Sequence, residues 1–448
     1  MSRERKEQAS VLVVDGGGRG SVLVDAYAKS SHVKKIFAVP GNDLMYLNAH
    51  GKPVETYPCL KTTNISDILK ICEDKKIDLV DVCQDNAVEA GLVNRLQEMG
   101  ILTVGPTREA GQIEWDKVWA RELGKKIGLP QPEFAVFSLQ EEAINFIEKS
   151  EDKPRFIKAR GLAEGKGALP ARNNKEALER IKEISRFGKA SDTFIVEDWI
   201  FGDGSGEEFS AFAISDGENV AYVGDAQDNK KALNFDEGEY TGGMGDVSSP
   251  LVLTPKLIEE SKEIFRRAID KLKEIGRVYK GILYLGGMVV NKVGKVTITI
   301  VEWNARWGDP EAQVIIPGIL NDLFELSIQV AEGSLKDEIR TNGKVRVAIT
   351  GASRGYPGDY TWVKGKEIYG INDAQKLEGV TIYSAGIKEV DKKHYANGGR
   401  LFYVVGEGKD VIEARARAYE GISRIHVEGN NVHFRTDIGW RDVERIRK

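Results

Sequence analysis

The chain has 448 residues, of which 41% are hydrophobic and 30% are charged, a balance typical of a soluble globular protein with two to four domains. Its net charge is −5 and its basic residues form no block, which argues against nucleic acid as a partner. The polar first residues are not the pattern of a signal peptide, and no apolar run reaches membrane-spanning length. Without such a run, we expect no membrane partner. Cys59, Cys72 and Cys83 lack metal-type spacing, so we expect reduced thiols and a cytoplasmic protein.

The first 108 residues alternate short apolar runs with helical patterns, which predicts a doubly wound parallel α/β domain. The expected strands are residues 11–14, 36–39, 79–82 and 102–105. The first strand runs into a glycine-rich turn, in which Ser21 takes the third glycine position of a dinucleotide-binding motif. The pattern therefore argues against NAD. The backbone N–H groups of such a turn can still bind a phosphate, and a tight turn without a ligand is the alternative.

Two helices are expected next: one from Thr107, as its cap, to Gly128, and a long charged one near residues 255–275. After Gly333 the pattern changes to short strands and turns, which predicts a separate α+β domain. The expected domains are residues 1–108, 109–333 and 334–448. The central one contains no His and no Cys, so its catalysis cannot rest on an imidazole base or a thiolate.

A second glycine-rich sequence, residues 158–167, lies at the centre of a small strand–helix unit predicted for residues 134–199. It fails the spacing of a P-loop, because only three residues separate Gly161 from Gly165 and Gly167 replaces the Ser or Thr that would hold Mg²⁺. Three glycines in one element are costly for a structural hairpin. We therefore expect a mobile lid that closes over phosphates beside the lysine that begins this sequence.

A predicted strand ends in a carboxylate and an amide. In the alternating pattern, Ile298, Ile300, Glu302 and Asn304 are expected to share one face. Side chains two residues apart along a strand lie about 6.5–7 Å from each other, so the oxygens of Glu302 and Asn304 can converge on one hard cation. Arg306 follows on the same side as a donor to phosphoryl oxygens. The pattern indicates Mg²⁺ bridging the phosphates of ATP, and a solvated strand end is the alternative.

Seven motifs in order resemble the glycinamide ribonucleotide synthetase (phosphoribosylamine–glycine ligase) family of ATP-grasp enzymes. The most specific is Glu-Trp-Asn-Ala-Arg-Trp-Gly-Asp-Pro-Glu-Ala-Gln at residues 302–313, with Trp at two positions that usually hold Phe. The likeness extends over residues 11–441. The other motifs are residues 105–107, 158–167, 241–245, 355–360, 397–400 and 437–441.

The resemblance implies an ATP-grasp domain over residues 109–333, with a lid at about residues 125–197. ATP would contact Lys117, Lys158, Gly161, Gly165, Lys166, Gly167, Glu197 at the adenine, the backbone of Trp199 and Ile200, and Glu208 at the ribose. Mg²⁺ or Mn²⁺ would bind Glu302 and Asn304, and the catalytic residues would be Arg306, Lys158 and Asp309. Glycine and phosphoribosylamine would bind near Gly17, Gly18, Arg19, Asp85, Asp228, Thr241, Gly242, Gly243 and Asp309.

The implied reaction joins glycine to 5-phosphoribosylamine through glycyl phosphate, with small molecules as the only partners and the protein a monomer. The chain departs from the usual motifs at Gly20-Ser21, at residues 83–88, where Asp85 replaces a glutamate, and at Asn229, which replaces a histidine. It also carries an insertion at residues 201–205. The alternative is therefore an ATP-grasp ligase for a different amine. A catalytically silent nucleotide-binding regulator is disfavoured, because the lysines and carboxylates of the ATP site are present.

Overall fold

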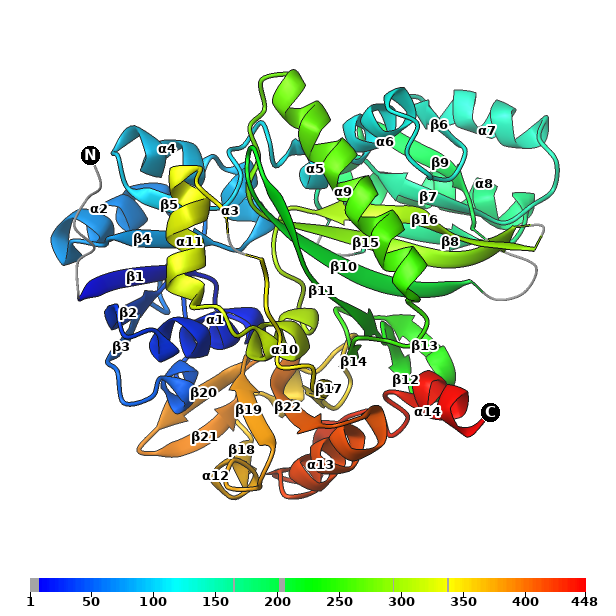
Figure 1. The fold of residues 1–448 in the computed structure, drawn as a ribbon. Helices are drawn as coiled ribbons and strands as arrows, with labels where there is room; N and C mark the ends of the chain where they lie inside the picture. Colours follow the sequence, from blue (N-terminus) through cyan, green and yellow to red (C-terminus); the bar gives the residue numbers. More distant parts are fainter. Residues whose placement is uncertain (1–7, 164–165, 201–205, 293, 337) are drawn as a thin grey trace.

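The computed structural model describes residues 8–163, 166–200, 206–292, 294–336 and 338–448 (Figure 1). Gly165 and the insertion at residues 201–205 lie outside the described residues. The main elements form an N-terminal parallel sheet, a small sheet in the lid unit and a long sheet that joins the middle of the chain to its C-terminal part. In the part of the chain that the structure describes, no helix is long and apolar enough to cross a membrane.

The N-terminal sheet is parallel, with five strands in the order β3-β2-β1-β4-β5, which confirms the predicted α/β domain. All four predicted strands are present. The additional strand β3 has three half-buried residues and no apolar run, so the sequence gives it no strand pattern. The elements are β1 (Ala9–Val14), α1 (Gly18–Lys29), β2 (Val33–Ala38), β3 (Val54–Thr56), α2 (Ile65–Lys75), β4 (Leu79–Val82), α3 (Asp85–Glu89), α4 (Leu92–Glu98) and β5 (Leu102–Val104).

Helices cover both faces of this sheet because every residue of β1 is apolar or buried. Val11 and Val13 point to one face and pack in the same core as Val22 of α1. Leu12 and Val14 point to the other face and share a core with residues of α2 and α4. Successive side chains of a strand point to opposite faces, so a continuous apolar run is what a strand covered on both sides requires.

The expected single helix from Thr107 to Gly128 is wrong. The structure has two helices, α5 (Gln112–Trp115) and α6 (Lys117–Lys126), which are separated at Asp116. Asp116 has an extended backbone, and its carboxylate accepts a hydrogen bond from the Trp119 N–H at 3.1 Å, so it caps α6. Arg160 of the lid unit donates to the same carboxylate at 2.6 Å, which ties the start of α6 to the lid.

The predicted strand–helix unit is confirmed as a four-stranded sheet in the order β6-β9-β7-β8. The glycine-rich sequence connects β7 to β8, as expected. Its elements are β6 (Phe134–Phe137), α7 (Gln140–Glu148), β7 (Arg155–Ala159), β8 (Ala168–Ala171), α8 (Asn174–Glu183) and β9 (Phe194–Asp198).

The long sheet has nine strands, eight of them in the order β16-β15-β10-β11-β14-β17-β22-β19, while β24 pairs with β17. It crosses the boundary expected at residue 333, because β14 pairs antiparallel with β17, with Asp246 opposite Ala348. The C-terminal strands β17, β19, β22 and β24 therefore continue the long sheet. The strands are β10 (Glu207–Asp216), β11 (Val220–Asp228), β14 (Gly245–Ser248), β15 (Lys280–Lys292), β16 (Lys295–Asn304), β17 (Val345–Ser353), β19 (Val380–Ser384), β22 (Arg400–Gly408) and β24 (Val432–His433).

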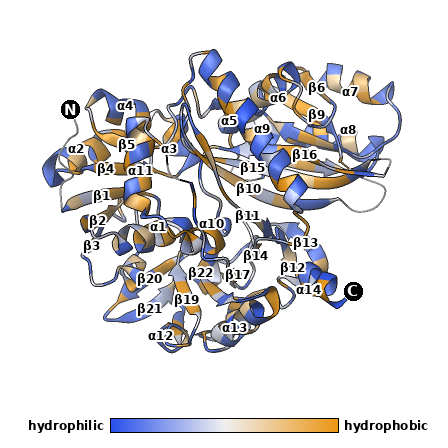
Figure 2. Ribbon diagram, in the orientation of Figure 1, coloured by the Kyte–Doolittle hydropathy of each residue, from blue (hydrophilic) through white to orange (hydrophobic). Residues whose placement is uncertain are grey.

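Helix α9 (Pro255–Glu274) is the long charged helix expected from the sequence, and it lies across the long sheet. Thr254 caps it and a proline follows at the first helical position, which explains where it begins. Hydrophilic and hydrophobic residues alternate along it (Figure 2), and its buried side, which includes Phe265, packs on β10, β15 and β16.

The remaining elements are helices and two smaller sheets. Helices α10 and α11 lie between the N-terminal sheet and the long sheet, and their buried residues share one core with α1. A further sheet has the order β20-β21-β18-β23, and β12 pairs with β13. These elements are β12 (Lys231–Leu233), β13 (Glu237–Tyr240), α10 (Glu311–Ile315), α11 (Leu323–Glu332), β18 (Glu367–Tyr369), α12 (Ile371–Ala374), β20 (Ile387–Val390), β21 (Lys393–Ala396), α13 (Val411–Ser423), β23 (His426–Val427) and α14 (Trp440–Arg447).

Asp81 of β4 makes stability depend on pH. It is 4% exposed and accepts a hydrogen bond from the Tyr27 hydroxyl at 2.7 Å. Burial, together with the nearby Asp15 carboxylate, raises the pKa of Asp81 from 3.8 to about 7. The folded state therefore binds more protons than the unfolded state between these two values, so this group's contribution to stability falls as pH rises from about 4 to about 7.

We expect Asp81→Asn to flatten that dependence, because the amide cannot ionise and its oxygen still accepts the hydrogen bond from Tyr27. The free energy of unfolding of the native chain should fall between pH 5 and pH 7 relative to the variant, by up to about 1.4 kcal/mol per pH unit. Denaturant unfolding at several pH values measures the difference, with the surface variant Asp74→Asn as control. Parallel curves for native chain and Asp81→Asn would contradict the assignment.

Candidate active site

The lid unit and the long sheet meet at a buried group of charged side chains. Lys158 of β7 forms an ion pair with Glu197 of β9, and Arg121 of α6 donates to the other oxygen of the same carboxylate at 2.9 Å. Glu197 is 2% exposed. Burial alone would raise the pKa of Glu197, but the two cations hold it below its usual value, so the carboxylate is ionised.

A β-bulge sets the direction of the two expected metal ligands. Between β15 and β16, Glu302 lies opposite Gly286 while Ile300 lies opposite the next residue, Gly287, so Val301 is an extra residue in β16. Arg121 donates to the carbonyl of Val301 and lies 3.3 Å from that of Ile300, which places the same arginine against both the bulge and Glu197.

The bulge makes one sequence prediction wrong. Ile298 and Ile300 pack in the core beneath α9 together with Trp303, whose ring centre lies 6.0 Å from that of Phe265. Because the extra residue reverses the alternation, Glu302 and Asn304 lie on the opposite face from the two isoleucines and not on the same one. They do share a face with each other, as predicted.

Three lysines surround the Glu302 carboxylate. Lys230 Nζ lies 3.9 Å from Glu302 Oε1 and 3.4 Å from Glu208 Oε2. Burial would raise the pKa of Glu302, but Lys230, Lys158 and Lys117 keep it below its usual value. Lys117 also donates to the Gly161 carbonyl at 3.2 Å, so it links the site to the start of the lid loop. Sequence reasoning missed Lys230, because only the fold brings it opposite Glu302.

At the end of β16, Asn304 is bonded to Arg306. The Asn304 Oδ1 atom accepts a hydrogen bond from Arg306 Nη2 at 2.9 Å, and Arg306 Nε lies 3.2 Å from Glu114 Oε1. Asn304 is 7% exposed, and its Nδ2 atom has no hydrogen-bond partner among the described residues. The orphaned N–H group is a donor, so it fits an acceptor such as a phosphate oxygen, while the Oδ1 atom keeps a second lone pair that can face a cation.

The residues present fit a Mg²⁺ or Mn²⁺ ion shared with a phosphate. Among the described residues, no three His, Cys, Asp or Glu side chains are grouped so as to hold a metal. An ion beside Glu302 and Asn304 must therefore take further oxygens from phosphate and water, which is how Mg²⁺ is usually held at nucleotide sites. A pocket beside them is lined by Glu208, Asp228, Lys230, residues 286–287 and Val301.

The other expected ATP contacts lie around the lid. The Trp199 N–H donates to the Pro154 carbonyl at 3.1 Å, so this donor is not available to an adenine ring. Gly161 N–H bonds to Ala190, and the Gly167 carbonyl accepts from Ala159, so both ends of the lid loop are anchored. Lys166 lies just before β8 and Ile200 just after β9, while Gly165 is not described.

A second group of residues surrounds the loop of residues 241–245. Gly243 has φ +118°, and a Cβ there would lie 2.4 Å from Pro310 and 2.9 Å from Asp228 Oδ1, so only glycine lets the loop pack on Asp228. Thr241 shapes the loop by accepting the Gly243 N–H at 3.0 Å. Asp228 Oδ1 is buried and has no hydrogen-bond partner among the described residues.

Two further carboxylates lie behind Asp228. Asp246 is fully buried, and Glu311 is 3% exposed and accepts hydrogen bonds from Ser210 and Tyr284. Burial and the charge of Glu311 raise the pKa of both Asp228 and Asp246 well above its usual value. Sequence reasoning missed these two residues, although Glu311 lies inside the longest motif.

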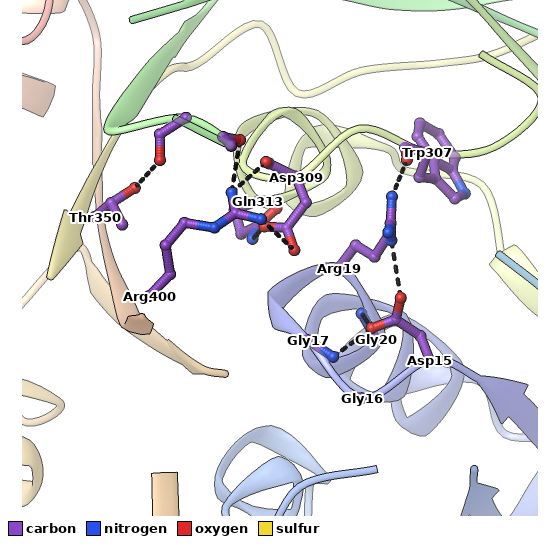
Figure 3. Close-up of polar contacts among 12 residues, drawn as sticks. Asp15, Gly16, Gly17, Arg19, Gly20, Trp307, Asp309, Gln313, Thr350 and Arg400 are labelled. Atoms are coloured by element: carbon purple, nitrogen blue, oxygen red, sulfur yellow. Dashed lines mark hydrogen bonds and ion pairs between the residues drawn. The ribbon is translucent and has the colours of Figure 1, made fainter. Parts of the chain in front are cut away.

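Two backbone donors of the turn after β1 are already bonded within the protein (Figure 3). The Asp15 carboxylate accepts hydrogen bonds from the backbone N–H groups of Gly17 at 2.5 Å and Gly20 at 3.2 Å. A Cβ at Gly18 would lie 2.0 Å from the Tyr403 ring. The expectation of free N–H groups for a phosphate is therefore wrong for Gly17 and Gly20, and packing alone requires glycine at Gly18.

Arg19 is buried, and two of its three nitrogens are bonded within the protein. Its Nε donates to Asp15 at 2.8 Å and its Nη1 to the Trp307 carbonyl at 2.8 Å, so it fastens the turn to the 302–313 motif (Figure 3). Asp309, which lies 3.2 Å from the Cβ position of Gly17, accepts a hydrogen bond from Gln313. The structure thus brings Gly17 close to Asp309, as the resemblance implies.

Asp85 belongs to a different element from that turn. It begins α3, and its Oδ1 accepts the Asn86 N–H at 2.8 Å. Its charge favours the protonated form of Lys117, although burial lowers the pKa of that lysine overall. The neighbouring Gln84 is the residue that bonds to Asp15.

Comparison with known proteins gives a consistent family over nearly the whole chain. The sequence matches the N, ATP-grasp (A) and C domains of phosphoribosylglycinamide synthetase over residues 9–114, 115–312 and 346–441. It is 36% identical over 433 residues to phosphoribosylamine–glycine ligase of Caldanaerobacter subterraneus, which covers 96% of this chain and 99% of that protein.

Two further relatives agree. The chain is 36% identical to the trifunctional purine biosynthetic protein adenosine-3 of Bos taurus over 98% of its own length, but it spans only 42% of that protein. The crystal structure of phosphoribosylamine–glycine ligase from Thermotoga maritima matches with a TM-score of 0.80 and 29% identity, covering 96% of this chain and 100% of that one. The chain belongs to the phosphoribosylglycinamide synthetase family.

Proposed function

We propose that the chain is a phosphoribosylamine–glycine ligase, which forms glycinamide ribonucleotide, ADP and phosphate from glycine, 5-phosphoribosylamine and ATP. The observation that carries the proposal is the 36% identity, over 99% of its length, to a protein with this name. In the reaction, the glycine carboxylate attacks the γ-phosphate of ATP to give glycyl phosphate, and the amine then displaces phosphate to form the amide. The reaction is a step of de novo purine synthesis.

For the ATP half of the site, we assign phosphate contacts to Lys117, Lys158 and the lid loop. Glu302 and Asn304 hold a divalent ion, which when bound neutralises the charge of the phosphates. Arg306, fixed by Asn304 and Glu114, stabilises the charge of the transferring phosphoryl group. We assign Glu197 to the adenine amino group and Glu208 to the ribose.

The acceptor half of the site is the part that binds glycine and the amine. There we assign the glycine amino group to Asp228, because a buried oxygen without a partner readily accepts hydrogen bonds from an ammonium group. The loop of residues 241–245 and Asp309 form the walls of this part of the site. We assign the amine substrate to the neighbourhood of Gly17 and Asp85, with Arg19 holding the turn in place. Catalysis then depends on positioning and charge, without an imidazole or a thiolate.

We also propose that the protein acts as a monomer in the cytoplasm. Its three cysteines are free in the structure, with Cys72 and Cys83 buried and Cys59 exposed. Thiols in this state are typical of a reducing compartment. The substrates are small molecules, and a monomer can hold all the residues assigned above within one chain.

The test is product analysis by mass spectrometry with ATP, Mg²⁺, glycine and freshly made phosphoribosylamine. We expect glycinamide ribonucleotide, and phosphate release that depends on both glycine and phosphoribosylamine. Phosphate release that requires glycine and an amine other than phosphoribosylamine would favour the alternative, a ligase for a different amine. Binding of ATP with no phosphate release under any combination would favour a regulator and contradict the proposal.

A further inference from the structure

The loop of residues 241–245 is held by side chains from the C-terminal part of the chain. The Gly242 N–H donates to the Tyr356 hydroxyl at 3.0 Å. The Thr350 hydroxyl donates to the Gly243 carbonyl at 3.1 Å (Figure 3). Both residues lie beyond the central part of the chain, on β17 and in the turn that follows it. The C-terminal strands therefore shape a loop that belongs to the acceptor half of the site.

Arg400, the first residue of β22, connects this loop to Asp309. Its Nη1 atom donates to the Gly242 carbonyl at 2.7 Å and to the Asp309 carbonyl at 2.6 Å (Figure 3). Its Nη2 atom lies 3.7 Å from the Asp309 carboxylate. One guanidinium group thus spans the two walls of the acceptor half and fixes the distance between them.

The surroundings suit an arginine and no other cation. Although burial opposes the charge, Tyr403, Asp309 and Tyr356 hold the pKa of Arg400 above its usual value. The planar guanidinium can donate to two carbonyls and face a carboxylate at once, whereas a lysine ammonium is a single point donor. A Cβ at Gly399 would lie 2.5 Å from the Tyr356 ring, so the glycine before Arg400 lets Tyr356 pack against this segment.

We propose that Arg400 is a positioning residue, which sets the spacing between the loop of residues 241–245 and Asp309 and thereby the fit of glycine and the amine. The proposal rests on the function proposed above, in which these two segments form the acceptor half of the site. It gives a role to the motif of residues 397–400, which no contact with ATP explains. The C-terminal segment is then a component of the substrate site.

The experiment uses the full chain and the variants Arg400→Lys and Tyr356→Phe. For Arg400→Lys we expect the KM values for glycine and phosphoribosylamine to rise about ten- to hundredfold, the loss typical of a charge-assisted hydrogen bond. Tyr356→Phe, which removes one neutral bond, should raise them by less. The KM for ATP should change less than about threefold, since uniform binding is lost only for the acceptors.

Arg417→Lys is the matched control, because Arg417 of α13 also bonds to a backbone carbonyl and a carboxylate in the C-terminal part but lies away from the loop. A second readout is hydrogen exchange of residues 241–245, which should become faster in Arg400→Lys and stay unchanged in Arg417→Lys. Equal increases of all three KM values, or effects no larger than those of the control, would overturn the proposal.

The two proposals fail in different ways. If the unaltered chain makes no glycinamide ribonucleotide, the proposed function fails, and the exchange of residues 241–245 still decides whether Arg400 holds the loop. If the unaltered chain makes the product and Arg400→Lys leaves both the acceptor KM values and the exchange unchanged, the positioning role is wrong while the function stands.

Discussion

Glu302→Gln is expected to lower kcat by about 10²–10³-fold at modest Mg²⁺, an effect of the size seen when a charge-stabilising group is lost from an active site. The substitution keeps the shape of the side chain but removes the negative charge that three lysines surround. High Mg²⁺ should restore part of the activity, because the weakened ligand lowers metal affinity first.

Activity assays over a range of Mg²⁺ concentrations measure this effect. Glu260→Gln is the matched control, because Glu260 of α9 contacts the same strand β16, accepting bonds from Thr297 and the Ile298 N–H, outside the proposed site. The control should keep normal turnover. Near-normal activity of Glu302→Gln at low Mg²⁺ would remove the assignment of Glu302 to the metal.

Asp228→Asn is expected to raise the KM for glycine about ten- to hundredfold while the KM for ATP stays nearly constant. The amide cannot pair with an ammonium group as the carboxylate does. The variant should nevertheless be more stable to unfolding. Burial and the charge of Glu311 raise the pKa of Asp228, so its ionised form destabilises the fold, and the neutral amide removes that cost.

Steady-state kinetics and thermal unfolding at neutral pH together test this prediction. Asp225→Asn is the control from the same strand, because Asp225 is bonded to Tyr222 and lies outside the proposed site. The combination of weaker glycine binding and a higher melting temperature is specific to Asp228. An unchanged KM for glycine would show that the amino group binds elsewhere.

Local patterns predicted much of the fold. Four strands of the N-terminal sheet and the glycine-rich connection between β7 and β8 follow from apolar runs and glycine spacing, which act over a few residues. The break at Asp116 also had a local signal, an aspartate able to cap the next helix, but the run of helix-forming residues on both sides hid it.

The features that the sequence did not predict depend on residues far apart in the chain. The bulge at Val301 is a change of register against Gly286 and Gly287, so β16 alone carries no sign of it. Likewise, Arg19 Nη1 donates to the carbonyl of Trp307, far along the chain, a contact that no local pattern indicates. Resemblance gave the motifs, but the pairing partners come only from the fold.

The sheet shared by β14 and β17 bears on how this protein can be divided. A chain that stops after α11 would leave the backbone groups of residues 245–247 as an unpaired edge, which is a template for aggregation. It would also release the loop that precedes β14 from Thr350 and Arg400. The C-terminal part is therefore not a module that truncation, shuffling or a split-protein design can detach. Any such exchange between relatives has to carry both strands of this pair across the junction together.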